Sequence, residues 1–300
     1  MNVNEVTPEF FEDIILFFKR AGYSFVSLSE VHEILASSTK PHKRFVAFTF
    51  DDGYIDNYTL AYPVLKKYQV PFTIYVTTNL VDQKAILWWY YLDKLVNEND
   101  RISLRFDCEE YEFNLSTDQE KREVFRKIRS MILSGDYTRF DERLEELLSP
   151  FFDDLFSLAR YSSLSWEQIE LLSNDPIATI GAHTVNHHPL SKLTEDKVYE
   201  EITRSKQIIE QHIHKNVEHF AYPYGTANEA GTREFRIAKE IGFKTVTTTR
   251  PGNIFITHGK HLECLPRLGI QPGRGIDKIE LFASGLTHFI KNRGRKIITY

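Results

Sequence analysis

Residues 45–54 read FVAFTFDDGY, a short run of mostly apolar residues followed directly by two carboxylates and a glycine. This composition predicts a strand over Phe45–Phe50 that is buried on both faces, as in a parallel sheet. Asp51 and Asp52 then stand at the carboxyl end of that strand, where active sites form in α/β barrels. Because Asp-Gly is also common in turns, the pair alone leaves a purely structural role open.

Helix and strand patterns alternate on both sides of this stretch. Apolar residues at helical spacing, with capping residues at the starts, predict helices, and short β-rich runs fall between them. The expected helices are 8–21, one ending near 35, 56–68, one beginning after 165, 194–214, 232–241 and 276–289; the expected strands are 24–28, 45–50, 71–77, 178–182, one at 220, 244–249 and 264–270. This alternation indicates an α/β fold with a mainly parallel sheet, either doubly wound or closed as a barrel.

Residues 82–164 do not fit the alternation. They contain a hairpin-like run over 102–115 and helical patterns over 119–134 and 138–149. We therefore expect a single domain over 1–300 that carries 82–164 as an α+β insertion at the mouth of the fold.

Three histidines lie within six residues directly after the strand pattern ATIGA, 178–182. His183 and His187 are four residues apart, so a helical turn would place both imidazoles on one face. Together with one carboxylate they supply three ligands and leave one position open, which is the composition of a catalytic zinc site. Iron or cobalt would accept the same ligands. His188 is the alternative to His187 as a ligand. The purely structural alternative is that these histidines only pack in the fold and bind no metal.

A third strand end reads FAYPYG over 220–225. One interpretation is a tight Pro-Gly turn that packs aromatic rings. In the functional interpretation, Tyr222 and Pro223 form a wall for a sugar ring, and a backbone N–H lies where an oxyanion develops. Trp88 and Trp89, which begin the insertion, are further candidates for stacking on a sugar, with packing inside the insertion as the alternative.

The ordered set TFDDGY, HTVNH and FAYPYG resembles the polysaccharide deacetylases, the NodB-homology group of carbohydrate esterase family 4, over about residues 45–270. The resemblance implies a deformed (β/α) barrel with fewer than eight regular strands and a metal-dependent hydrolysis of N-acetyl groups on sugars. It also implies the following roles: general base at Asp51, metal carboxylate at Asp52, imidazole ligands at His183 and His187, and an oxyanion-binding backbone N–H at Tyr224.

The chain departs from the family pattern at the arginine that orients the catalytic aspartate and at the general acid, among other places. Many members carry an arginine shortly before the proline of the third motif, where it orients the catalytic aspartate, but no arginine precedes Pro223 here. We propose Arg267, in the run LPRLG, as the partner of Asp51. The late Leu-x-His motif that supplies the family's general acid has no clean match, and the remaining late histidines do not fit its spacing: His258, His261 and His288.

Composition narrows the class of protein. With 300 residues, 42% hydrophobic and 26% charged, the chain is expected to be a soluble globular protein, and two cysteines are too few for a disulfide framework. A formal charge of -5 gives no general attraction to nucleic acid. No apolar run approaches the roughly 20 residues that span a bilayer. The N-terminus lacks a signal-peptide pattern, so a cytoplasmic location is expected unless that end is truncated.

The leading hypothesis is a deacetylase of N-acetylated sugars in a bacterial surface or lipid-linked glycan. It would use one divalent ion, with zinc as the first expectation and cobalt, iron or nickel as alternatives. A metal-free amidase of the same fold and a carbohydrate-binding protein with a relic site are the competing hypotheses. The amidase branch usually lacks the complete Asp-His-His set that this chain carries.

Overall fold

The computed structural model describes residues 6–37, 41–135, 137–270, 275–295 and 297. Within these ranges the chain divides into two compact units, a smaller one over Asp82–Ser162 and a larger one from the described parts of 4–81 and 163–300. Leu164, which we expected inside the insertion, belongs to the larger unit, where its N–H donates to the Gly53 carbonyl at 2.9 Å.

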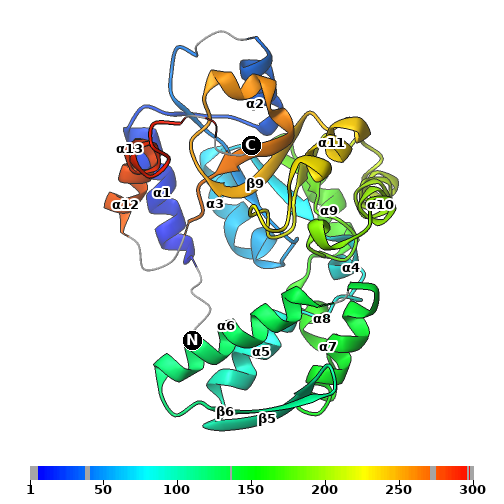
Figure 1. The fold of residues 1–300 in the computed structure, drawn as a ribbon. Helices are drawn as coiled ribbons and strands as arrows, with labels where there is room; N and C mark the ends of the chain where they lie inside the picture. The colour runs from blue at the N-terminus through cyan, green and yellow to red at the C-terminus, as the bar shows by residue number, and fades with distance from the viewer. Residues whose placement is uncertain (1–5, 38–40, 136, 271–274, 296, 298–300) are drawn as a thin grey trace. The chain divides into compact units, whose positions relative to one another are not determined.

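The larger unit is built on a curled sheet, to which β9 belongs (Figure 1). Its six described strands have the order β10-β9-β8-β7-β4-β3. The strands are β3 Phe48–Phe50, β4 Phe72–Val76, β7 Ala178–Ala182, β8 His219–Ala221, β9 Thr245–Pro251 and β10 Leu265–Arg267. All neighbours in this sheet pair in parallel. The sheet forms a half-barrel flanked by helices, which confirms the predicted deformed (β/α) barrel with fewer than eight regular strands.

The strand predicted over 45–50 is divided in two. β2 (Phe45–Val46) pairs in parallel with β1 (Ser24–Phe25), whereas β3 pairs with β4. Ala47 belongs to neither strand, because the chain changes its pairing partner at this residue. The prediction of one continuous strand was therefore wrong at its centre, although its carboxyl end is placed correctly.

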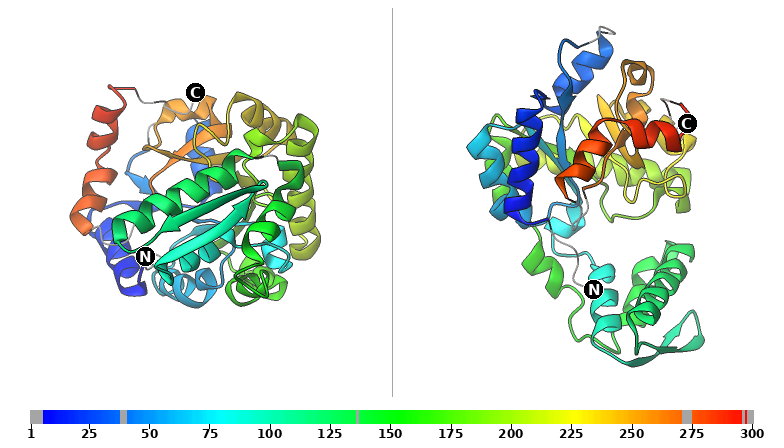
Figure 2. Two further views of the ribbon diagram at one scale, coloured as in Figure 1. Left: turned by 60° about the horizontal axis from the view of Figure 1, so that its bottom comes forward. Right: turned by 90° about the vertical axis from the view of Figure 1, so that its left-hand side faces the viewer.

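Helices pack around the sheet (Figures 1 and 2), and all but α4, which was not predicted, overlap a predicted helix. They are α1 Pro8–Arg20, α2 Leu28–Ala36, α3 Tyr62–Tyr68, α4 Thr78–Val81, α9 Trp166–Ser173, α10 Glu195–Ile213, α11 Thr232–Ile241, α12 Ile276–Ala283 and α13 Leu286–Lys291, with short 3-10 turns at Leu190–Lys192, Ile256–Lys260 and Leu262–Cys264. Ser165 forms the predicted capping box at the start of α9.

Two predicted helices are interrupted. The helix expected over 56–68 begins as a π-helix, Asn57–Ala61, and becomes α-helical only at Tyr62. Pro63 follows at once and has no N–H to donate, so the regular hydrogen-bond ladder cannot run through this point. The helix expected over 276–289 ends at Ala283, because Gly285 adopts a left-handed φ of 76°, and α13 begins after it at Leu286.

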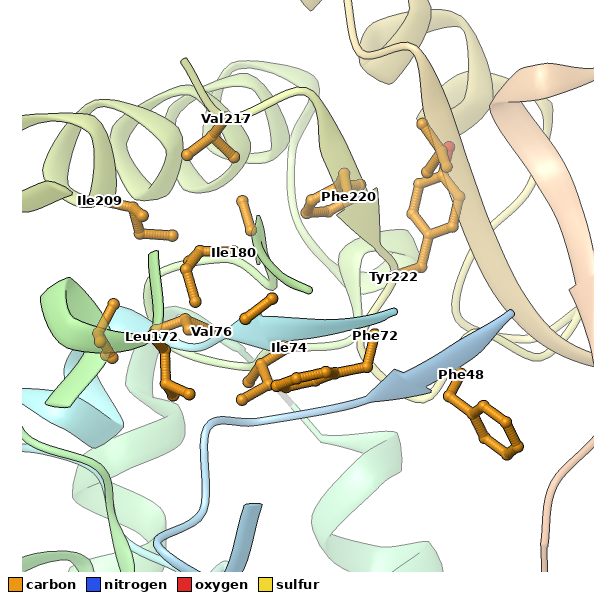
Figure 3. Close-up of a cluster of buried hydrophobic side chains, with 14 of the residues drawn as sticks. Phe48, Phe72, Ile74, Val76, Leu172, Ile180, Ile209, Val217, Phe220 and Tyr222 are labelled. Atoms are coloured by element: carbon orange, nitrogen blue, oxygen red, sulfur yellow. The ribbon is translucent and has the colours of Figure 1, made fainter. Parts of the chain in front are cut away.

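The strands are buried on both faces, as the apolar pattern predicts. On the helix side of β4, Phe72, Ile74 and Val76 join one core with residues of β7, β8 and the outer helices (Figure 3). Tyr75 points to the opposite face, because side chains alternate along a strand, and packs inside the barrel. Gly181 makes room for it: a Cβ there would lie 2.5 Å from Tyr75 Cδ1.

The smaller unit has an α+β fold, as expected. Its elements are α5 Trp88–Asn97, β5 Arg101–Phe106, β6 Glu109–Asn114, α6 Asp118–Ser134, a 3-10 turn at Tyr137–Arg139, α7 Phe140–Leu148 and α8 Ser157–Ser162. β5 and β6 form an antiparallel hairpin (Figure 2). At its turn, Asp107 accepts two hydrogen bonds of 2.7 Å from the buried Arg143 guanidinium. In neither unit does a described helix have the length and apolar character needed to cross a membrane.

Candidate functional site

The three motifs lie at the carboxyl ends of three strands of the larger unit. Asp51 and Asp52 follow β3, His183 follows β7, and the Tyr-Pro-Tyr turn follows β8. Because the carboxyl ends of parallel strands lie along one edge of a sheet, these segments meet although they are far apart in the sequence.

Asp52, His183 and His187 form one group whose ligand atoms lie within 4.8 Å of one another. Asp52 Oδ1 is 3.4 Å from His183 Nε2 and 3.2 Å from His187 Nε2. The His183 side chain is buried, whereas Asp52 and His187 keep some exposed surface. The structure thus brings together the three residues predicted as metal ligands, and His188 is not part of the group.

The donor set fits a cation. His183 Nδ1 lies 2.7 Å from the Ala221 carbonyl oxygen, so this nitrogen carries the hydrogen and Nε2 faces Asp52. Asp52 Oδ1 is buried and accepts no hydrogen bond in the part of the chain described. Burial lowers the pKa of His183, but Asp52 and Asp51 outweigh it and raise that pKa above its usual value. An anionic oxygen facing two imidazole nitrogens thus attracts positive charge, which a divalent ion would supply.

The segment that joins the two histidines is not the helical turn that we expected. Thr184 and His187 adopt left-handed φ angles of 66° and 56°. The His187 N–H donates to Thr184 Oγ1 at 3.0 Å. The two imidazoles converge because two left-handed residues fold the loop back on itself, and the spacing of four residues is not helical in origin.

Asp51 faces a different partner from Asp52. Asp52 adopts a left-handed φ of 73°, an uncommon backbone state that often marks functional sites. Asp51 receives hydrogen bonds from Arg267 Nη1 to Oδ1 at 2.6 Å and from Nη2 to Oδ2 at 2.8 Å. This is the pairing that we proposed from the sequence, and its role in catalysis stays a prediction.

Arg267 is itself held in place by two further contacts. Its Nε donates to the Thr248 carbonyl at 2.9 Å, and Nη1 donates to Thr49 Oγ1 at 3.2 Å. Burial raises the pKa of Asp51, but the charges of Arg267 and His183 outweigh burial and hold that pKa below its usual range. Asp51 is therefore a carboxylate at neutral pH.

The third motif differs from the prediction at Tyr222. This ring has no exposed surface, and its hydroxyl donates to the Glu263 carbonyl at 2.8 Å, so it packs in the core and offers no wall to a sugar. Pro223 is buried in the turn. Tyr224 lies at the site instead: its ring centre is 4.8 Å from that of His187, and its φ is 59°. The sequence pointed to the Tyr224 N–H but not to its ring.

In the smaller unit, Trp88 has only 2% of its surface exposed, so it packs and does not offer a face to a sugar. Trp89 lies edge-on to it, with ring centres 5.6 Å apart, and is partly exposed. Its contact with substrate stays a prediction.

None of the late histidines gains support as the general acid. His258 is fully buried, and its Nδ1 accepts the Phe255 N–H at 3.0 Å. His261 lies 3.9 Å from the buried Glu263 carboxylate. The side chain of His288 lies outside what the structure describes.

The family model for polysaccharide deacetylases matches residues 38–130 and 144–246. The chain therefore belongs to the polysaccharide deacetylase family, as its three motifs indicated.

Two curated relatives share this similarity. YxkH of Bacillus subtilis (strain 168), named for the same family, is 23% identical over 252 residues, covering 84% of this chain and 61% of that protein. The poly-beta-1,6-N-acetyl-D-glucosamine N-deacetylase of Escherichia coli (strain K12) is 24% identical over 249 residues, covering 82% of this chain and 31% of that protein. The chain thus spans less than two thirds of the length of either relative.

Solved structures agree on the fold. The deacetylase PplD of Streptococcus pyogenes, solved in complex with acetate, superposes with a TM-score of 0.61 at 22% identity, covering 93% of this chain and 87% of that one. IcaB of Ammonifex degensii gives a TM-score of 0.59 at 19% identity, with coverages of 93% and 89%. The deformed barrel is therefore common to all three chains.

Proposed function

We propose that this protein is a metal-dependent hydrolase that removes N-acetyl groups from the sugars of a bacterial surface or lipid-linked glycan. The observation that carries the proposal is the group of Asp52, His183 and His187 beside a second carboxylate, Asp51, that is paired with Arg267. One relative is named for N-deacetylation of a poly-N-acetylglucosamine, which makes such oligomers the first substrates to test. The predicted cytoplasmic location stays a prediction.

Asp52, His183 and His187 would hold one divalent ion. Zinc is the first choice for this ligand set, with cobalt, iron or nickel as alternatives. When bound, such an ion polarises a carbonyl as a Lewis acid and acidifies water. An acetamide needs this help, because resonance makes its carbonyl a poor electrophile.

Asp51 would act as the general base. Its two oxygens are fixed by Arg267, and its low pKa keeps it ionised, so it can accept a proton from the attacking water. The backbone N–H of Tyr224 would donate to the oxyanion of the tetrahedral intermediate. When the C–N bond breaks, the leaving amine needs one proton, and the proton taken by Asp51 can be returned to it. Acetate and the free amino sugar are then the products.

The test combines metal content with acetate release. Elemental analysis should show one metal ion per chain in wild type and a loss of that ion in Asp52→Asn and His187→Ala. His188→Ala is the matched control and should keep the ion. Metal-loaded wild type should release acetate from β-1,4- or β-1,6-linked N-acetylglucosamine oligomers.

Two results would contradict the proposal. A wild-type protein that neither contains nor takes up a divalent metal would favour the metal-free amidase. One metal ion per chain without acetate release from any N-acetylated glycan would favour a relic site.

A further inference from the structure

A buried carboxylate of α10 lies behind the loop that joins the two histidines. Glu201 has 8% of its surface exposed. Its Oε2 accepts the backbone N–H groups of Val185 and Asn186, each at 3.0 Å, and its Oε1 accepts Asn186 Nδ2 at 2.5 Å. A carboxylate is costly to bury unless hydrogen bonds replace its water. Here the replacing donors all come from the loop between His183 and His187.

The same loop is held from its other side by α4. The Asn79 N–H donates to the Val185 carbonyl at 3.0 Å, and the Thr78 N–H donates to the Thr184 carbonyl at 3.3 Å. Asn79 Nδ2 also donates to Asn186 Oδ1. Asn186 thus connects α4 to Glu201 through its side-chain amide.

The backbone of this loop needs such support. Thr184 and His187 both adopt left-handed φ angles, which cost free energy in non-glycine residues and persist only where the surroundings hold them. His187 follows Asn186 directly, so the direction of its imidazole depends on where the Asn186 backbone is fixed.

We infer that Glu201 is a positioning residue for the candidate metal site. By binding two N–H groups and one side-chain amide of the loop, it holds the His183 and His187 Nε2 atoms toward Asp52 before any metal arrives. Glu201 is not itself one of the grouped ligands. The inference rests on the proposed function for its metal, but the state of the loop in the metal-free protein can be measured independently of it.

The chemistry of these contacts suggests a variant with a designed rescue. In Glu201→Gln, the Gln oxygen can keep both backbone N–H groups, but its Nε2 then faces Asn186 Nδ2, so two donors oppose each other. Adding Asn186→Asp places an acceptor opposite that Nε2 and still offers an oxygen to Asn79. The double variant also restores the net charge.

Glu200→Gln is the matched control. Glu200 precedes Glu201 on α10, is half exposed, and pairs only at the surface with Lys197 at 2.7 Å. Its substitution removes the same charge from the same helix without touching the loop.

Two measurements test the inference. Zinc affinity, from competition with a chromophoric chelator, should fall about 10- to 100-fold in Glu201→Gln, the usual effect of losing a residue that supports metal ligands. Amide hydrogen exchange over 184–187 in the metal-free protein should become faster in the same variant. Both should return close to wild type in the Asn186→Asp/Glu201→Gln double variant, and Glu200→Gln should change neither.

Wild-type zinc affinity together with wild-type exchange in Glu201→Gln would overturn the inference. It would also be overturned if Glu201→Gln lowered the melting temperature while the folded protein kept its zinc affinity, because Glu201 would then be merely structural. If wild type binds no metal, the proposed function fails, and the exchange measurement still decides: rescue in the double variant supports the positioning role, and equal rates in all variants refute it.

Discussion

Replacing Arg267 by methionine should cost the protein about 3 kcal/mol of unfolding free energy, at the low end of the range for breaking a buried ion pair. The charges of Arg267 and Asp51, about 4 Å apart, attract each other by about 4 kcal/mol at an effective dielectric constant of about 20. Since 31% of the Asp51 side chain is exposed, water screens part of this attraction. We therefore expect a coupling of about 2 kcal/mol, within the range for hydrogen bonds to charged groups.

A double-mutant cycle isolates this coupling from the other contacts of Arg267. The four proteins are wild type, Arg267→Met, Asp51→Asn and the double variant, each unfolded with urea at pH 7 without added metal. The double variant should be more stable than the sum of the two single effects predicts, because the second substitution removes a partner that is already lost. Arg267→Lys, which keeps the charge but not the paired hydrogen bonds, should lie between wild type and Arg267→Met.

The reasoning is refuted if the two single effects add to within about 0.5 kcal/mol, as they do for independent sites. The pair would then orient the Asp51 carboxylate without adding measurably to the free energy of unfolding, and the low pKa of Asp51 would need another cause.

The same variant shifts activity along the pH scale. Arg267 lowers the pKa of Asp51 against the raising effect of burial. Without the guanidinium the burial remains, so the pKa rises. The acid limb of the pH–rate profile, where the base loses its proton, should therefore move to higher pH in Arg267→Met. An unchanged acid limb would show that Asp51 is not the group that titrates there.

Two further predictions concern the barrel interior. Burial lowers the pKa of His219 from 6.5 to about 4, so between these pH values the unfolded chain binds a proton that the folded chain does not. The free energy of unfolding should therefore fall by about 3 kcal/mol between pH 6.5 and 4. The difference in this free energy between wild type and His219→Gln, from urea unfolding, should change with pH by that amount, and a difference that is constant with pH would refute the prediction. Gly181→Ala should lower the free energy of unfolding by about 1–3 kcal/mol, because the added methyl group would clash with the Tyr75 ring. An unchanged urea midpoint would show that the ring moves aside freely.

The site could be predicted largely because its residues follow short buried strands. In a parallel sheet the carboxyl ends of the strands lie together, so the DDGY and HTVNH motifs meet whatever separates them in the sequence. Arg267 could be proposed for the same reason, since it ends β10 at that edge.

Other features depend on tertiary packing that a residue type does not reveal. Tyr222 and Tyr224 are two positions apart in one motif, yet the first is fully buried and the second lies against His187. Glu200 and Glu201 look equivalent on an acidic helix, and only the direction of the loop N–H groups distinguishes them.

β3 and β10 are the two outermost described strands of the sheet, and Arg267 at the end of β10 binds Thr49 on β3 and Asp51 directly after it. Side chains therefore connect these two outermost strands, whereas a closed barrel would join them by a ladder of backbone hydrogen bonds. Asp51, the carboxylate of this ion pair, is also the proposed general base. The proposed role of Asp51 requires a carboxylate that can exchange a proton, so an apolar side-chain contact between the two strands could not replace this ion pair without loss of the base.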